Sequence, residues 1–332
     1  MRGTASFPFK PGGHQRIAVK VIDFREKGGE DGKSSWRRCV TCPFLNLNWR
    51  DGLIKEGVAT AKQTHESVRA AVGAYTWPGG VDYEVYLHGS YKNDTNIRSD
   101  SDVDVVVQLN STCFENLPED QKRRFGYRNA SYGWQSFRSD VLKWLRNNYG
   151  SQPVSEGRKS LKVQTRYLPA DVVVCLQYRK YPSYPRNVAD YVEGMTSYVP
   201  SENRRVVNYP KIHYDNGVTK NSRAGTNGWY KPTVRLFKNA RTYLVDRGLI
   251  SADLAPSYFL ECLLYNVPND KFGSNFQSTF CNVINWLLEA DLSQFVCQNE
   301  QLRLFGKTPE QWSKDKARRF LQAMVKLWSD WR

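Results

Sequence analysis

Residues 87–108 read LHGSYKNDTNIRSDSDVDVVVQ, and this stretch indicates both the fold class and the position of a candidate site. The valine-rich run 102–109 is typical of a β-strand. Asp102 and Asp104 stand two residues apart in it, so both carboxylates project from one face of the strand. Two like charges side by side need a counter-charge, and Mg²⁺ supplies one because it prefers carboxylate and phosphate oxygens. For this pair alone, two solvent-facing aspartates on an edge strand are the commoner case.

Two further features favour a phosphate-binding site. Gly89 and Ser90 follow a short β-prone run, and glycine lets the backbone approach a phosphate that serine and the next helix start can bind. A third acid, Asp171, stands at the head of an apolar run, where a charge faces either a site or merely the end of a strand. The three acids together could hold two Mg²⁺ or Mn²⁺ ions for an in-line displacement at phosphorus. Asp102 and Asp104 would bridge both ions, and Asp171 would bind mainly the ion at the nucleophile.

The spacing of apolar residues predicts the order of elements around these acids. The expected elements are a helix over 53–75, strands over 84–87, 102–109, 160–164 and 171–177, and a helix around 142–145. This order predicts a mixed α/β domain. From about residue 191 the strand signals fade, and 209–227 reads as a loop. Helices then dominate, one of them beginning near Pro232 and ending at Gly248.

Composition limits the class of partner and the compartment. Lys and Arg number 48 against 33 Asp and Glu, and the net charge of +15 favours either a polyanionic partner or a solvated basic surface. No apolar run is long enough to span a membrane and no secretory signal is recognisable, so a cytoplasmic protein is expected. Of the seven cysteines, Cys39 and Cys42 lie close together, but no second ligand pair at zinc spacing accompanies them.

Several of these stretches resemble one family. Residues 87–98 and 101–108 look like the bacterial cGAS/DncV-like nucleotidyltransferases, which belong to the DNA polymerase β-type superfamily. Residues 168–174 are similar to the strand that carries their third carboxylate. The segments 209–217 and 255–259 also look like theirs, so the resemblance runs through most of the chain.

This resemblance implies an α+β fold: a polymerase β-type core of mixed sheet and flanking helices over 51–190, and an α-helical nucleotide-binding lobe over 191–332. The basic stretch 1–50 departs from the family and is expected to be an extension. The implied activity is the synthesis of cyclic or linear oligonucleotide second messengers from NTPs in bacterial anti-phage defence, with release of pyrophosphate. The product would activate a downstream effector protein. Lys238 and Ser257 match by position the residues that hold the donor triphosphate in the lobe.

The residues of the lobe leave two interpretations open. Lys231, Arg235 and Lys238 fall at i, i+4 and i+7, off the apolar face of the helix near Pro232. They form either a basic stripe that meets a triphosphate or a solvated helix face. Tyr258 could stack on a base or belong to the core. His213 is interpreted as structural or as a substrate contact.

Two other functions remain open from the sequence. The same acids would serve nucleotidyl transfer to an antibiotic, a protein or an RNA end, and a catalytically silent scaffold would bind nucleotide and signal by changing shape. The presence of all three acids argues against the silent scaffold. A basic cluster of Arg123, Arg124 and Arg128 is either a site for an activating nucleic acid or a solvated surface.

Overall fold

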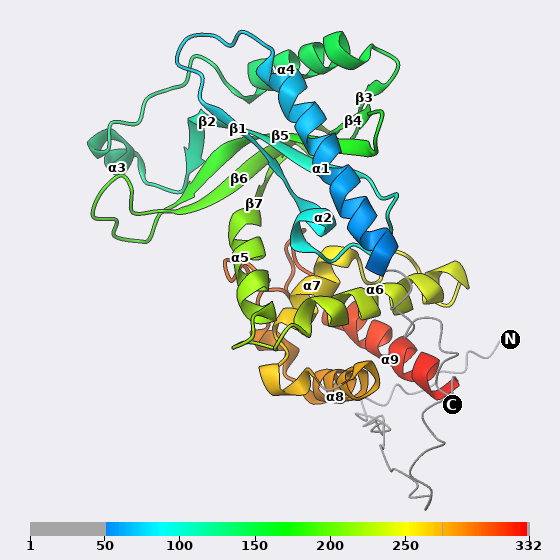
Figure 1. Ribbon diagram of the computed structural model, residues 1–332. Coiled ribbons are helices and arrows are strands. Elements are labelled where there is room, and N and C mark those ends of the chain that lie inside the picture. The colour runs from blue at the N-terminus through cyan, green and yellow to red at the C-terminus, as the bar shows by residue number, and fades with distance from the viewer. Residues whose placement is uncertain (1–50, 274, 331–332) are drawn as a thin grey trace, which may run out of the picture.

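A mixed sheet of seven strands forms the centre of the first part of the chain, within the residues that the structure describes (Figure 1). The structure is a computed structural model and describes residues 51–273 and 275–330, so the expectations for residues 1–50 lie outside the described residues. The strands are β1 (Tyr83–Leu87), β2 (Val103–Glu115), β3 (Val154–Glu156), β4 (Leu161–Gln164), β5 (Pro169–Lys180), β6 (Val192–Val199) and β7 (Arg204–Asn208). Their order is β1-β2-β5-β4-β3, with β6 also paired to β5 and β7 to β6. Only β2 and β5 among these described pairs run parallel.

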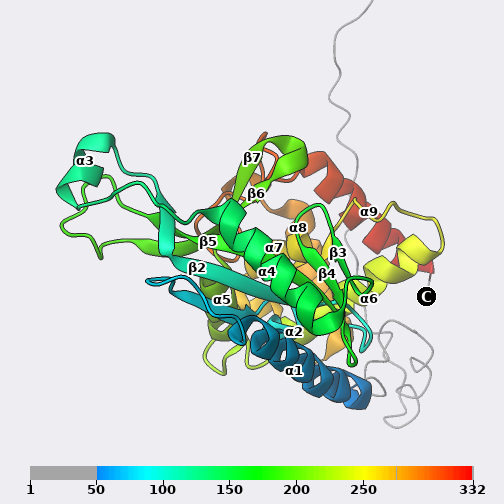
Figure 2. The same cartoon turned by 90° about the horizontal axis from the view of Figure 1, so that it is seen from above.

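Two long helices cover one face of this sheet. They are α1 (Asp51–Gly73) and α4 (Trp134–Tyr149), which lie over the strands in both views (Figures 1 and 2). Val103, Val105 and Val107 of β2 are buried in a cluster with both helices. Because side chains alternate along a strand, Asp104 and Val106 point to the opposite face. The helix predicted over 53–75 and the four predicted strands are confirmed.

The second part of the described chain is a helical lobe that faces the other side of the sheet (Figure 1). Its α-helices are α5 (Pro210–Asn221), α6 (Tyr230–Asp246), α7 (Ser257–Tyr265), α8 (Phe276–Glu289) and α9 (Lys314–Asp330). The helices α6 to α9 enclose one large apolar cluster. Val234, Phe237 and Ala240 of α6 are buried in it, as their spacing predicts. The fold class is therefore confirmed as α+β, a mixed sheet with helices and a helical lobe.

Two expectations for the segment 191–227 are wrong. Strands do not fade after residue 191, because β6 and β7 extend the sheet to Asn208. Thr196 and Ser197 of β6 are buried although they are polar, so apolar patterning alone does not reveal this strand. The proposed domain boundary at 190 stays a prediction, and these strands continue beyond it.

The segment 209–227 is not a loop either, since α5 occupies most of it. The buried residues of this helix are Pro210, His213 and Gly217, which follow a helical spacing but are not apolar side chains. Gly217 packs closely against the lobe: a Cβ at this position would lie 2.4 Å from Nε2 of Gln298. Helix α5 therefore packs through polar and small residues, which sequence periodicity does not detect.

One buried carboxylate joins the lobe to the sheet domain. Glu261 of α7 is 4 % exposed, and its oxygens accept hydrogen bonds from four side chains. The donors are Lys238 Nζ at 2.6 Å, Thr95 Oγ1 at 2.8 Å, His213 Nε2 at 2.9 Å and Asn93 Nδ2 at 3.0 Å. Burial by itself would raise the pKa of Glu261, but Lys238 and then His213 hold it well below its ordinary value. The carboxylate is therefore charged and binds the loop after β1 to three helices of the lobe.

We expect Glu261→Gln to lower the free energy of unfolding by roughly 3–5 kcal/mol, because it leaves the Lys238 ammonium buried without a counter-charge. Urea unfolding followed by circular dichroism measures this difference. Glu289→Gln, which removes an exposed carboxylate of α8, is the matched control and should unfold like the wild type. Adding Lys238→Met to Glu261→Gln should restore part of the loss. Equal stability of Glu261→Gln and the wild type would show that the charge is not what joins the two parts.

Candidate active site

The three predicted acids lie on the face of the sheet that is turned away from α1 and α4. Asp104 and Asp171 are direct neighbours in the register of the parallel strands β2 and β5. Asp102 precedes Asp104 by two residues, just before β2 begins. Burial, and then the nearby charges of Asp171 and Asp102, together raise the pKa of Asp104 to about 6. The structure thus gathers an excess of negative charge where the parallel strands β2 and β5 begin.

A lysine that the sequence analysis did not single out partly balances this charge. Lys162 Nζ lies 2.9 Å from Asp171 Oδ1 and 3.7 Å from Asp102 Oδ2. It reaches them because β4 pairs with β5 so that Lys162 is opposite Asp171. The neighbours of Lys162, Leu161 and Val163, are buried toward α4, and this alternation is the signal that could have predicted its direction.

The acids fit a divalent metal in chemistry but are not yet gathered around one. Their oxygens are hard donors of the kind that Mg²⁺ prefers, and Asp104 is buried beside two like charges. Within 51–273 and 275–330, however, no three His, Cys, Asp or Glu side chains are already close enough to hold a metal ion. In this arrangement Lys162 provides the positive charge that a cation would supply.

The turn after β1 fits closely around Asp104. The backbone N–H of His88 donates to the backbone oxygen of Asp104 at 2.8 Å, and the short helix α2 (Gly89–Asn93) follows. Gly89 has a φ of +66°, and a Cβ on it would lie 1.9 Å from Asp104 Oδ2. Only glycine therefore lets the backbone pass this carboxylate without displacing it. This backbone conformation at Gly89 also begins the short helix α2.

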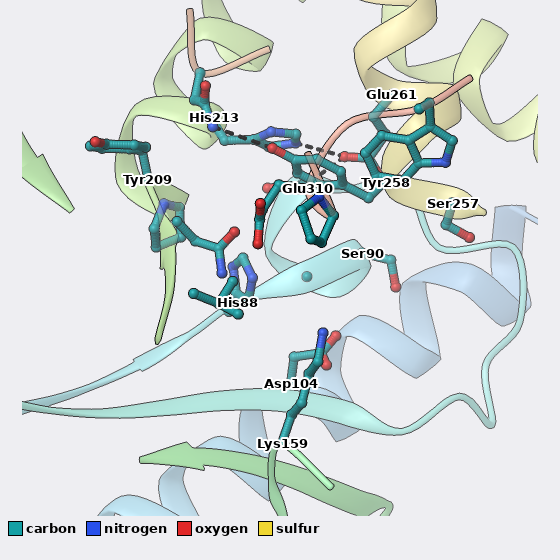
Figure 3. Close-up of a pocket in the computed structure, with 18 of the residues that line it drawn as sticks. His88, Ser90, Asp104, Lys159, Tyr209, His213, Ser257, Tyr258, Glu261 and Glu310 are labelled. Atoms are coloured by element: carbon teal, nitrogen blue, oxygen red, sulfur yellow. Dashed lines mark hydrogen bonds and ion pairs between the residues drawn. The ribbon is translucent and has the colours of Figure 1, made fainter. Parts of the chain in front are cut away.

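A cavity of about 590 Å³ lies between the sheet and the lobe, in the size range of small-molecule sites (Figure 3). It brings together most of the residues that the sequence predicted. Those that line it are Gly89, Ser90, Asp104, Lys238, Ser257 and Tyr258. Asp102 and Asp171 are not among its lining residues, but they adjoin it through Asp104. Other lining residues that the sequence analysis did not propose as site residues include His88, Lys159, Arg204, Asn299, Glu310 and Trp312.

Lys238 lies in this cavity but not on a solvated stripe. It is 3 % exposed, and its ammonium donates to Thr95 O at 3.1 Å and Thr95 Oγ1 at 3.0 Å as well as to Glu261. Arg235 donates to the backbone oxygen of Asp94 at 2.7 Å. Lys238 and Arg235 therefore both bind the segment after α2. The expectation that Lys231, Arg235 and Lys238 all lie off the packed face of the helix is wrong for Lys238. Its contact with a triphosphate stays a prediction.

Tyr258 belongs to a stack of rings on the lobe side of the cavity. Its ring lies 5.2 Å from that of His213 at 22°, and 5.9 Å from that of Trp312 at 33°, measured between centroids. Asn299 Nδ2 donates to its hydroxyl at 3.2 Å. Tyr258 therefore packs and also borders the cavity. His213 is buried by its bond to Glu261, in agreement with the structural interpretation, and it borders the cavity as well.

The fold and the carboxylate pair define a nucleotidyltransferase, and two family models match the chain. Residues 74–143 match the nucleotidyltransferase domain, and residues 215–329 match the cGAS/DncV-like nucleotidyltransferase C-terminal helical domain. The chain is 64 % identical over 272 residues to a cyclic UMP-AMP synthase of Rhodothermus marinus, covering 82 % of this chain and 93 % of that protein. It is 40 % identical to the cyclic nucleotide synthase CdnE01 of Staphylococcus haemolyticus, over 75 % of this chain and 85 % of that one.

A solved structure of the Rhodothermus marinus CdnE synthase has a TM-score of 0.79 and 61 % identity, covering 84 % of this chain and 96 % of that chain. The chain therefore belongs to the cGAS/DncV-like nucleotidyltransferases. It is an enzyme of the cyclic nucleotide synthase type, and both of these relatives are bacterial. In the part of the chain that the structure describes, no helix combines the length and the apolar character that crossing a membrane requires.

We expect Gly89→Ala to lower kcat by at least about 100-fold, because the added methyl group displaces the Asp104 carboxylate and a shift of about 1 Å can cost that much. The variant should still fold, since the displaced atoms are the end of one side chain. Gly80→Ala is the matched control: Gly80 also has a positive φ, +81°, but no atom lies within 4 Å of its added Cβ. Steady-state rates of pyrophosphate release measure the effect. Similar activity in the two variants would contradict the close fit at Asp104.

We expect Asp104→Asn to stabilise the protein in EDTA at pH 7 by on the order of 1–3 kcal/mol while abolishing activity. The native pKa of Asp104 is raised from 3.8 to about 6, so ionisation of this group opposes folding above pH 6. The gain should shrink as the pH falls from 6 to 4, where native Asp104 takes up a proton. Denaturant unfolding at several pH values measures it, with the exposed Asp100→Asn as control. An unchanged or lowered stability at pH 7 would refute the repulsion.

Proposed function

We propose that this enzyme joins UTP and ATP into a cyclic dinucleotide. The observation that carries the proposal is the 64 % identity to a cyclic UMP-AMP synthase over 93 % of that protein. The related Rhodothermus structure was solved with Apcpp and Upnpp, analogues of the two substrates. The cavity between sheet and lobe, with Asp104 on one side and Tyr258 on the other, offers an acid for the reacting phosphate and a ring for a base.

We further propose that Asp102, Asp104 and Asp171 hold two Mg²⁺ ions, or Mn²⁺ in their place. When bound, such ions lower the pKa of the attacking hydroxyl and stabilise the pyrophosphate that leaves. The protein itself fixes Asp104 against Asp171 through the strand register and against Gly89 through close packing. Lys162 must give up its ion pairs with Asp171 and Asp102 for these oxygens to bind a cation.

Ser90, Ser257 and Lys238 complete the proposed nucleotide site. Ser90 and Ser257 line the cavity from opposite parts of the molecule, the first from the turn after β1 and the second from the start of α7 (Figure 3). Lys238 already neutralises Glu261, so its charge is shared between that carboxylate and a substrate phosphate. We propose that it contributes by fixing the cavity wall and by orienting a phosphate, rather than as a free cation.

The proposed role is the production of a signal inside a bacterial cell during anti-phage defence. Its support is the family to which the chain belongs and the names of its relatives, which are cyclic nucleotide synthases. The product would act on a downstream effector protein, and a ligand or nucleic acid could activate the synthase. Transfer to a non-nucleotide acceptor and a silent scaffold are not favoured, because these relatives are synthases and the three acids are in place.

We expect purified protein with Mg²⁺ to convert a mixture of labelled UTP and ATP into a phosphatase-resistant dinucleotide. Neither nucleotide alone should give the same product. Mass spectrometry identifies its bases. Asp104→Ala and Asp171→Ala should reduce the product by at least about 100-fold, since they remove ligands of the proposed ions. Asp100→Ala, which removes an exposed aspartate of the same segment, should retain activity. A product of other bases would refute the substrate pair, and an active Asp104→Ala would refute the metal site.

A further inference from the structure

The cations that line the cavity differ in whether they already have a partner. Lys238 is neutralised by Glu261. Arg204 Nε lies 2.6 Å from Glu202 Oε2, and the same guanidinium pairs with Glu310. Lys159 also lines the cavity, yet among the described residues it makes no hydrogen bond and no ion pair. Its ammonium therefore has all three donors free.

The backbone around Lys159 is a tight turn at the tip of the hairpin that joins β3 to β4. The N–H of Gly157 donates to the oxygen of Ser160 at 2.8 Å, and a Cβ on Gly157 would lie 3.0 Å from that oxygen. The preceding residue, Arg158, pairs with Glu202 at the turn between β6 and β7. The hairpin tip is thus held against the sheet, and Figure 3 shows the ammonium end of Lys159 directed into the cavity.

The charge around Lys159 favours an anion. Partial loss of hydration, and then the charges of Arg158 and Arg204, lower the pKa of Lys159, whereas the charge of Glu310 raises it. Three cations (Arg158, Lys159 and Arg204) stand against two carboxylates (Glu202 and Glu310), and the carboxylates are already paired with the two arginines. The positive charge left over is that of Lys159. An anion that enters the cavity can therefore bind it without breaking an existing ion pair.

We propose that Lys159 binds phosphate oxygens of a nucleoside triphosphate in the cavity. This inference rests on the proposed function, because it requires that a nucleotide occupy this cavity. The β3–β4 hairpin would then contact the substrate, in addition to the acidic strands and the helical lobe. A hydrogen bond between charged groups contributes about 1.5–3 kcal/mol, so its loss should weaken nucleotide binding by roughly 10- to 100-fold.

The test is the affinity of Lys159→Met for a non-hydrolysable ATP or UTP analogue in the presence of Mg²⁺, measured by calorimetry. We expect a dissociation constant raised at least about 10-fold, while the affinity for the nucleosides adenosine and uridine is unchanged. Lys159→Arg should restore most of the affinity. Because the side chain is exposed, the melting temperature of Lys159→Met should match the wild type.

Arg158→Met is the matched control, because it removes one positive charge from the same hairpin at a residue that does not line the cavity. It should change analogue binding less than about threefold. Equal losses in Arg158→Met and Lys159→Met would overturn the proposal in favour of a general field effect. Unchanged binding in Lys159→Met would overturn it outright. If the wild type bound no nucleotide analogue at all, the proposed function itself would fail and this inference with it.

Discussion

The carboxylate of Glu261 fixes how the helical lobe sits on the sheet. A buried charge is costly unless it is well hydrogen-bonded, and here four donors from three segments meet one carboxylate. Two donors, Asn93 and Thr95, follow the glycine turn, and two come from lobe helices. The same network therefore places the turn beside Asp104 and the wall that carries Tyr258 and His213. A single anion sets the distance across the cavity, because a shift of one side against the other would break its hydrogen bonds to Asn93 and Thr95.

The two-residue period of the strands is the second constraint, and it acts on the chemistry directly. Valines of β2 and β5 are buried toward α1 and α4, so the aspartates between them must face the lobe. Register then determines which acids meet: Asp104 lies opposite Asp171, and Lys162 on the next strand lies opposite Asp171 as well. A shift of one residue in β5 would bury Asp171 under α4. Core packing on one face thus protects the geometry on the other.

These constraints explain what could be predicted from the sequence. Elements with a strong apolar period, such as α1, α6, β2 and β5, were predicted correctly, and the Asp-x-Asp pattern indicated the acidic site. Strand β6 and helix α5 were missed because they pack through Thr196, Ser197, His213 and Gly217, whose burial depends on partners far along the chain. Lys162 and Lys159 reach the site only through hairpin and strand pairing, which composition does not encode. The burial of Lys238 likewise depends on Glu261, 23 residues later.

The net charge of +15 does not translate into an open basic cavity. Two of the cations that line the cavity, Lys238 and Arg204, are held by carboxylates of the same molecule, so they shape its walls more than they attract a polyanion. Opposite them, the buried repulsion among Asp104, Asp171 and Asp102 leaves the acidic side short of positive charge. The proposed substrate, a triphosphate that arrives with divalent cations, would supply that charge and would itself be partly neutralised. Under the proposed function, this arrangement would suit a metal-bound nucleotide better than a bare anion, which distinguishes it from a general nucleic-acid surface.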